Sequence, residues 1–184
     1  MESPVLILPG LNGSGPAHWQ TRWELLLPAA RRVQARDWDR PSREEWVAAL
    51  DVAVAAAGPE AVLVAHSLGC LQVAHWVAWT ARAVRGPARR LVRGALLVAP
   101  PDPGRPEFPA VITGFAPLPT VSLPFPSTLV ASSNDPYGSF DFAASCASAW
   151  GSRLVEAGAR GHLNADSGLG DWEEGLRLLD ELRS

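Results

Sequence analysis

The chain of 184 residues is long enough for one domain with a hydrophobic core, and its 47% hydrophobic and 19% charged residues indicate a globular protein. The net charge is −3, and the sixteen basic residues are scattered arginines, so we expect no nucleic-acid-binding face. There is no lysine, which excludes a Walker A phosphate loop and a pyridoxal phosphate enzyme, because both need that side chain.

The first residues, Met1 to Pro4, lack the basic and apolar regions of a secretory signal, and no apolar run approaches the roughly 20 residues of a membrane span. We therefore expect a cytoplasmic protein without membrane contact. Cys70 and Cys146 stand in apolar surroundings, which predicts buried thiols rather than a disulfide. The four histidines are dispersed without metal-ligand spacing, so we expect neither a metal nor a cofactor.

Apolar runs that suit buried strands alternate with helical patterns along the chain. This alternation predicts a single α/β domain over residues 1–184, with about six mostly parallel strands and helices on both faces of the sheet. In chain order, we expect strands at 5–8, 32–36, 61–65, 94–99, 128–132 and 153–156, and helices at 18–27, from a cap at 42 to about 57, from 68 onward, at 140–150 and at 172–182.

Some local features carry further expectations. In the first helix we expect Trp19, Trp23, Leu26 and Leu27 on the inner face. Ser42 with Glu45 three residues later fits a capping box, and the helix that they begin should stop at Gly58-Pro59. The proline-rich stretch Pro100–Pro126 should have little regular structure, and with Phe108, Phe115 and Phe125 it is either one wall of an acyl pocket or a rigid surface connection.

The stretch around Ser67 is typical of a nucleophile elbow. Ser67 and Gly69 follow the apolar run that ends at Ala65, and a helical pattern begins at Leu68. A strand, a sharp turn and a helix in this order raise the serine hydroxyl above the sheet, and the next backbone N–H, on Leu68, then faces a developing oxyanion. The usual motif is G-x-S-x-G, and Ala65 stands in place of its first glycine.

The residues that follow the other strands complete a possible catalytic triad. Ligands of such sheets bind outside the carboxyl ends of the strands, where Ser67, Asp135 and His162 occur in the chain order of an α/β-hydrolase. We assign Ser67 as nucleophile, His162 as general base and then acid, and Asp135 as the acid that orients the imidazole. Asp102 and Asp166 are alternative acids.

Further site residues come from the loop after the first strand. Its backbone should give the second oxyanion donor, from Leu11 or from Asn12. His18 either caps the first helix or reaches the site, and Trp19 is the tryptophan nearest to this loop. We therefore expect His18, Trp19 and Phe108 to line a shallow substrate pocket that suits small esters or short acyl groups.

At these motifs the sequence resembles the YdeN-like, retinoblastoma-binding-protein-nine type of small serine hydrolases. The resemblance rests on blocks that span nearly the whole chain: Leu8-Pro9-Gly10, Gly13-Ser14-Gly15-Pro16, His18-Trp19-Gln20, His66-Ser67-Leu68-Gly69, Ser133-Asn134-Asp135-Pro136-Tyr137, Gly161-His162-Leu163-Asn164, Ser167-Gly168-Leu169-Gly170 and Trp172. It implies an α/β-hydrolase without a large lid and carries the triad onto Ser67, Asp135 and His162. A retinoblastoma-pocket ligand needs L-x-C-x-E, but the nearest match ends in Gln72, so that partner is not carried over.

The sequence therefore predicts a carboxylesterase-like serine hydrolase that acts on a small acyl substrate, an ester or an amide or aminoacyl compound, through a covalent acyl-enzyme. Monomer and weak dimer both stay open. One alternative is a non-catalytic binding protein on a hydrolase scaffold. The other is a dinucleotide-binding oxidoreductase, with the loop Gly10–Gly15 at the phosphates and Asp37 at a ribose hydroxyl, although the glycine spacing is not G-x-G-x-x-G.

Overall fold

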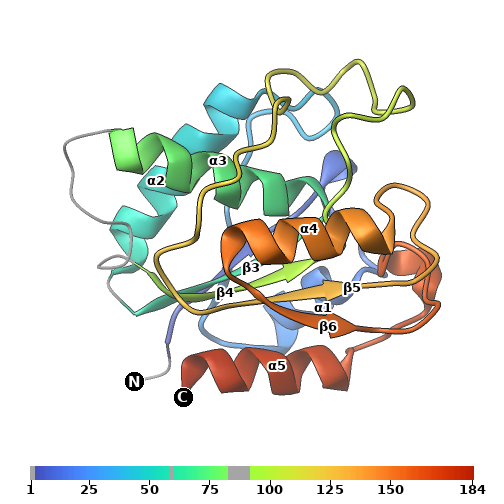
Figure 1. Ribbon diagram of the computed structural model, residues 1–184. Helices are drawn as coiled ribbons and strands as arrows, with labels where there is room; N and C mark the ends of the chain where they lie inside the picture. The colour runs from blue at the N-terminus through green and yellow to red at the C-terminus, as the bar shows by residue number, and fades with distance from the viewer. Residues whose placement is uncertain (1–2, 59, 83–91) are drawn as a thin grey trace.

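Six strands form one sheet, in which every neighbouring pair is parallel and the spatial order is β2-β1-β3-β4-β5-β6 (Figure 1). The computed structural model describes residues 3–58, 60–82 and 92–184. The strands are β1 (Val5–Leu8), β2 (Ala30–Arg32), β3 (Ala61–His66), β4 (Val92–Val98), β5 (Ser127–Ala131) and β6 (Arg153–Glu156), and the helices are α1 (Trp19–Leu26), α2 (Arg43–Ala57), α3 (Leu68–Arg82), α4 (Phe140–Trp150) and α5 (Glu173–Arg183). The predicted six-stranded α/β architecture is confirmed.

The helices form a layer on each face of the sheet, with α2, α3 and α4 on one side and α1 and α5 on the other (Figure 1). Alternate side chains of each strand enter the two cores, as the period of two in a strand requires. In β1, Leu6 and Leu8 face the core between the sheet and α2–α4, whereas Val5 and Ile7 face the core between the sheet, α1 and α5. Because both faces are covered, the central strands are continuously apolar in sequence.

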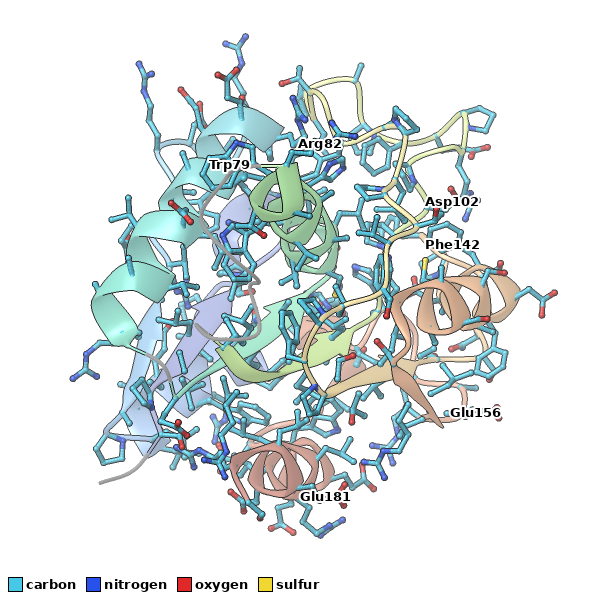
Figure 2. The ribbon with its side chains drawn as sticks, turned by 60° about the vertical axis from the view of Figure 1, so that its left-hand side comes forward. Trp79, Arg82, Asp102, Phe142, Glu156 and Glu181 are labelled. Atoms are coloured by element: carbon cyan, nitrogen blue, oxygen red, sulfur yellow. The ribbon has the colours of Figure 1, made fainter. Side chains whose placement is uncertain are left out.

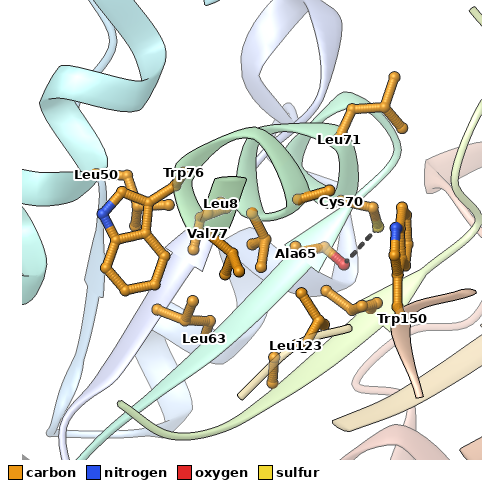
Figure 3. Close-up of a cluster of buried hydrophobic side chains, with 14 of the residues drawn as sticks. Leu8, Leu50, Leu63, Ala65, Cys70, Leu71, Trp76, Val77, Leu123 and Trp150 are labelled. Carbon is orange, nitrogen blue, oxygen red and sulfur yellow. Dashed lines mark hydrogen bonds between the residues drawn. The ribbon is translucent and has the colours of Figure 1, made fainter. Parts of the chain in front are cut away.

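The core between the sheet and α2–α4 contains large buried aromatic side chains. Trp76 of α3 and Trp150 of α4 are almost inaccessible and lie at opposite ends of the cluster that also contains Leu63 of β3 (Figure 3). Cys70 lies in this core with its thiol directed at the Ala65 carbonyl, 3.7 Å away. Cys70 and Cys146 are both buried free thiols, as predicted.

Two predicted strand and helix features are wrong in detail. The second strand is Ala30–Arg32 rather than 32–36, because Ala30–Arg32 pairs with Val5–Ile7 of β1. On α1, Leu26 was expected on the inner face but is 49% exposed, because the helix turns only Trp19 and Trp23 fully into the core.

The predicted capping box at the start of α2 does not form. Ser42 is the N-cap residue, but its side chain makes no capping hydrogen bond. The Glu45 carboxylate instead pairs with Arg36 at 3.0 Å. The helix ends at Ala57 with Gly58 as its C-cap, and Pro59 lies outside the described residues. Within the part of the chain that the structure describes, no helix is long and apolar enough to span a membrane.

Gly69 allows α3 to pack directly on the end of β1, and we expect its replacement to destabilise the fold. A Cβ at this position would lie 2.3 Å from the Leu8 carbonyl oxygen. Gly69→Ala should therefore lower the free energy of unfolding by about 1–3 kcal/mol, the range for overpacking, in urea denaturation. Gly15→Ala is the matched control, because nothing lies within 4 Å of its added Cβ, and it should change the free energy by less than about 0.5 kcal/mol. Equal losses would contradict the close-packing argument.

Candidate active site

Ser67 occupies the sharp turn that joins β3 to α3. Its φ angle is +54°, in the left-handed region, which costs a non-glycine residue on the order of 1 kcal/mol or more. Hydrogen bonds hold the turn on both sides: the Ser67 N–H donates to the Val98 carbonyl at 2.9 Å, and the Cys70 N–H donates to the Ser67 carbonyl at 2.9 Å. The strained turn therefore presents the hydroxyl at the carboxyl edge of the sheet.

Two small residues, Gly10 and Ala65, lie close to Ser67. A Cβ on Gly10 would lie 2.8 Å from the Ser67 Cβ, so the loop after β1 passes next to Ser67 only because residue 10 is glycine. Ala65, where a glycine is usual in the elbow motif, is completely buried in the core between the sheet and α2–α4. Its methyl group is thus accommodated by packing.

Three side chains from separate strand ends form a continuous chain of hydrogen bonds. The Ser67 hydroxyl lies 2.8 Å from His162 Nε2, and His162 Nδ1 lies 2.8 Å from Asp135 Oδ2 and 3.0 Å from Oδ1. Because an ionised carboxylate only accepts, Nδ1 carries the proton, and Nε2 is left to accept from the serine. Asp135 Oδ1 also accepts the Tyr137 N–H at 2.9 Å, which fixes the carboxylate. The arrangement has the connectivity that nucleophilic activation needs.

The two alternative acids do not contact His162. Asp102 follows β4, and its Oδ1 accepts the Gly104 N–H at 2.8 Å (its place in the loop is labelled in Figure 2). Asp166 lies in a short turn after His162, where its N–H donates to Asn164. Of the three candidate acids, only Asp135 is placed behind the imidazole.

Two backbone N–H groups beside Ser67 are available to an oxyanion. Leu68 is the first residue of α3, and Leu11 lies in the loop beside it; within residues 3–58, 60–82 and 92–184, neither N–H donates to another protein group. The N–H of Asn12, the alternative donor, is already committed to the Trp38 carbonyl at 2.9 Å. The geometry therefore favours Leu68 and Leu11.

The loop that carries Leu11 is held by a buried polar network. The Gln20 amide, 0% exposed, donates to the Leu8 carbonyl at 3.1 Å and to the Val64 carbonyl at 3.0 Å, at the ends of β1 and β3. Its oxygen accepts the Ser14 hydroxyl at 2.7 Å. The Arg32 guanidinium donates to two carbonyls of the same loop. Gln20 thus ties the loop to the strand that precedes the elbow.

A cavity of about 390 Å³ opens over the Ser67 hydroxyl. His18 and Phe108 line it, as expected, but Trp19 does not. Trp19 is 1% exposed and lies in the core between the sheet, α1 and α5, because its indole N–H is drawn inward to the Leu163 carbonyl, at 2.8 Å. In the proline-rich segment, Phe115 and Phe125 do not line the cavity. Both are buried in the core between the sheet and α2–α4.

The other three histidines are neutral at pH 7. His18 caps α1 by accepting the Gln20 N–H at 3.1 Å, and burial, with the nearby charges of His162 and Arg32, lowers its pKa to about 4. Burial lowers the pKa of His66 well below its usual value. His75 bonds the Phe115 carbonyl at 2.9 Å, and burial lowers its pKa as well.

Sequence reasoning missed the residues that hold the His162 loop. The Asn134 side-chain oxygen accepts the Gly161 N–H at 2.7 Å and the Ser132 hydroxyl at 2.9 Å. His66 Nε2 bonds the His162 carbonyl at 2.9 Å. Asn134 and His66 adjoin Asp135 and Ser67 in the sequence and follow or end a strand. Since the carboxyl ends of parallel strands meet at one edge, this position could have indicated that they lie near His162.

Asp37 and the possible metal ligands bear on the cofactor-binding alternative. The Asp37 carboxylate, which that alternative places at a ribose hydroxyl, accepts the N–H groups of Asp39 and Arg40 in its own turn. Among the described residues, no group of three or more histidine, cysteine or acidic side chains is placed to hold a metal ion.

Comparison with known proteins places the chain in a family. It matches the serine hydrolase family model over residues 5–181, and it therefore belongs to the serine hydrolase family. A protein described as a YdeN-like hydrolase from Pectobacterium atrosepticum is 35% identical, with a TM-score of 0.80 over 98% of this chain and 90% of that chain. The predicted YdeN-like α/β-hydrolase family is thus confirmed, and the protein is a hydrolase.

More distant structures share the fold alone. The ydeN gene product of B. subtilis is 19% identical, with a TM-score of 0.71 over 98% of each chain. Thermogutta terrifontis esterase 2, in a form phosphonylated by cyclosarin, is 16% identical, with a TM-score of 0.71 over 98% of this chain and 81% of that chain. A search of curated proteins found no significant match.

The lowered pKa of His18 predicts an acid-sensitive fold. Between pH 6.5 and about 4 the unfolded chain binds a proton at this side chain that the folded protein does not, so the free energy of unfolding falls as pH falls through this window. His18→Asn keeps a capping acceptor and should remove up to about 1.4 kcal/mol per pH unit from that slope in urea unfolding. Ser139→Asn, at the cap of α4, is the non-titrating control. An unchanged slope in His18→Asn would refute the assignment.

Proposed function

We propose that this hydrolase cleaves small esters through a covalent acyl-enzyme on Ser67, with His162 and Asp135 as its catalytic partners. The observation that carries the proposal is the unbroken hydrogen-bond chain from the serine hydroxyl through the imidazole to the carboxylate, 2.8 Å at each link. The family assignment supports hydrolysis, and the geometry supports these three side chains as the groups that perform it.

In the acylation step, Ser67 Oγ bonds to the ester carbonyl carbon while its proton moves to His162 Nε2. The carbonyl oxygen becomes an oxyanion, which the N–H groups of Leu68 and Leu11 stabilise from a fixed position. The bond between the carbonyl carbon and the leaving oxygen then breaks, and His162 gives its proton to the departing alcohol. Asp135 stabilises the imidazolium that exists between these transfers.

In the deacylation step, water repeats the same sequence on the acyl-enzyme. His162 takes a proton from the water as its oxygen attacks the acyl carbonyl, and the same two N–H groups hold the second oxyanion. Collapse of that intermediate releases the acid and returns the proton to Ser67. The cycle thus ends with the Ser67 hydroxyl again hydrogen-bonded to a neutral His162.

The pocket supports a small, mostly apolar acyl group. Its volume, about 390 Å³, is near the lower end of the usual ligand-pocket range of roughly 300–1,000 Å³. The proline-rich segment contributes an apolar wall of Phe108, Pro109 and Ile112. An amide or aminoacyl bond can use the same groups, with a poorer leaving group and hence a slower acylation.

A fluorophosphonate probe tests the nucleophile. We expect covalent labelling of the native protein and none of Ser67→Ala, because only a serine hydroxyl activated by an imidazole attacks the phosphorus quickly. Ser133→Ala is the control, since Ser133 is an exposed serine that also follows a strand. Intact-protein mass spectrometry gives the readout. Labelling that persists in Ser67→Ala would move the nucleophile elsewhere, and no labelling of the native protein would favour a binding protein on a hydrolase scaffold.

A series of p-nitrophenyl esters tests the acyl pocket. We expect kcat/KM to be highest for short acyl chains and to fall for long ones, because the cavity cannot enclose a lipid-length chain. Phe108→Ala removes part of the wall and should shift the optimum to longer chains. Val111→Ala is the control, because Val111 lies in the same segment but is 48% exposed and does not line the cavity. An identical chain-length profile in Phe108→Ala would exclude this wall as the acyl site.

A further inference from the structure

The backbone around His162 has an unusual conformation. Gly161 and Leu163, on either side of it, have φ angles of +59° and +51°. For leucine this left-handed region is sparsely populated, and such a residue persists only where its surroundings hold it in place. The position of the His162 ring therefore depends on the groups that hold this loop.

Side chains from distant parts of the chain hold the loop by its main-chain atoms. The Trp19 indole N–H donates to the Leu163 carbonyl at 2.8 Å, and the His66 Nε2–H donates to the His162 carbonyl at 2.9 Å. The Asn134 side-chain oxygen accepts the N–H of the preceding residue, Gly161, at 2.7 Å. Each of three successive residues is thus fixed by a partner on another element.

The donors to the two carbonyls are deeply buried. Trp19 is 1% exposed and His66 is 4% exposed, so bulk water does not reach these two hydrogen bonds in the native protein. His66 is neutral, and the carbonyl can only accept, so its Nε2 carries the proton. Leu163 itself is completely buried, which leaves its carbonyl dependent on the indole. A buried carbonyl that loses its donor is strongly unfavourable, and the loop would move to satisfy it.

We infer that Trp19 is a positioning residue for the hydrolysis: its indole N–H holds the Leu163 carbonyl and thereby keeps His162 Nε2 within reach of the Ser67 hydroxyl. Trp19 does not line the cavity, but its ring packs against His18 and His66, which do, and its indole N–H reaches the His162 loop directly. The inference rests on the catalytic role proposed for His162. A shift of about 1 Å in a reacting group can cost on the order of 100-fold in rate.

The chain offers a matched control in Trp23. It lies one turn further along α1, is equally buried, and packs edge-to-face on Trp19 with ring centroids 4.7 Å apart. Its indole N–H also donates to a distant carbonyl, that of Asp171, at 2.7 Å. The two tryptophans hold different carbonyls, and only that of Trp19 adjoins His162; Trp19 also packs on His66, a contact that a phenylalanine ring at this position can keep.

The experiment compares Trp19→Phe with Trp23→Phe, since each keeps an aromatic ring and loses one indole N–H. With a short-chain p-nitrophenyl ester, we expect Trp19→Phe to lower kcat by roughly 10- to 100-fold with KM within about two-fold. Trp23→Phe should keep kcat within about two-fold and lose a similar amount of thermal stability. In proton NMR, the His162 Nδ1 proton that is bonded to Asp135 should broaden through faster exchange with water in Trp19→Phe alone.

A second variant guards against a folding failure. His66→Phe removes the N–H that holds the His162 carbonyl and should also lower kcat by at least about 10-fold. Equal kcat values for Trp19→Phe and Trp23→Phe would overturn the inference, as would an unchanged His162 signal in Trp19→Phe. His162→Ala separates the two proposals: if it retains native turnover, the proposed function fails, whereas if it is inactive and Trp19→Phe is not impaired, only the positioning role fails.

Discussion

The contact between the ends of β1 and β3 determines where the site is built. These strands are neighbours, with Leu8 paired to Ala65, so the loop after β1 and the turn after β3 leave the sheet side by side. Gly10 and Gly69 allow the two segments to come closer than any side chain would permit. Leu11 is thereby brought beside Ser67, and the proposed nucleophile and the proposed oxyanion donors belong to backbone segments that pack directly on each other.

Backbone strain is concentrated at the same edge of the sheet. The non-glycine residues with positive φ among those described are Asn12, Ser14, Ser67, Ala99, Leu163 and Trp172. All but Trp172, which precedes α5, lie in segments that follow strands. Each such residue costs about 1–3 kcal/mol and is retained only where surrounding contacts fix it. Here the two buried cores and polar anchors such as Gln20 supply those contacts. The regular, well-packed interior of the sheet thus offsets the conformational cost of the strained residues in the loops at its edge.

The architecture could be predicted from the sequence, because buried parallel strands appear as apolar runs. The residues directly after these runs then identified Ser67, Asp135 and His162 as candidates in the chain order of an α/β-hydrolase. The sequence could not choose Leu11 over Asn12, since that depends on which N–H already has a partner, here the Trp38 carbonyl. Trp19 was misplaced for a related reason. Proximity in sequence to the glycine loop suggested the pocket, whereas the direction of the indole is set by a carbonyl 144 residues away.

The proline-rich segment shows how a region without regular structure can still have a defined shape. Its backbone is anchored from beneath by buried side chains: His75 bonds the Phe115 carbonyl at 2.9 Å, and the Trp150 indole donates to the Pro119 carbonyl at 3.0 Å. Phe115 itself is buried in the core. Phe108, earlier in the segment, faces the cavity instead.

Phe115 and Phe108 therefore meet different requirements, one in the core and the other at the cavity wall. Residues such as Phe115 are constrained by close packing against α2 and α3, where a change of volume is costly. Phe108 borders open space, so a different side chain there would alter the cavity without disturbing the core. The shape of the cavity can therefore vary at this wall while Ser67, His162 and Asp135 stay fixed at the edge of the sheet, and one scaffold can accommodate different ligands in this way.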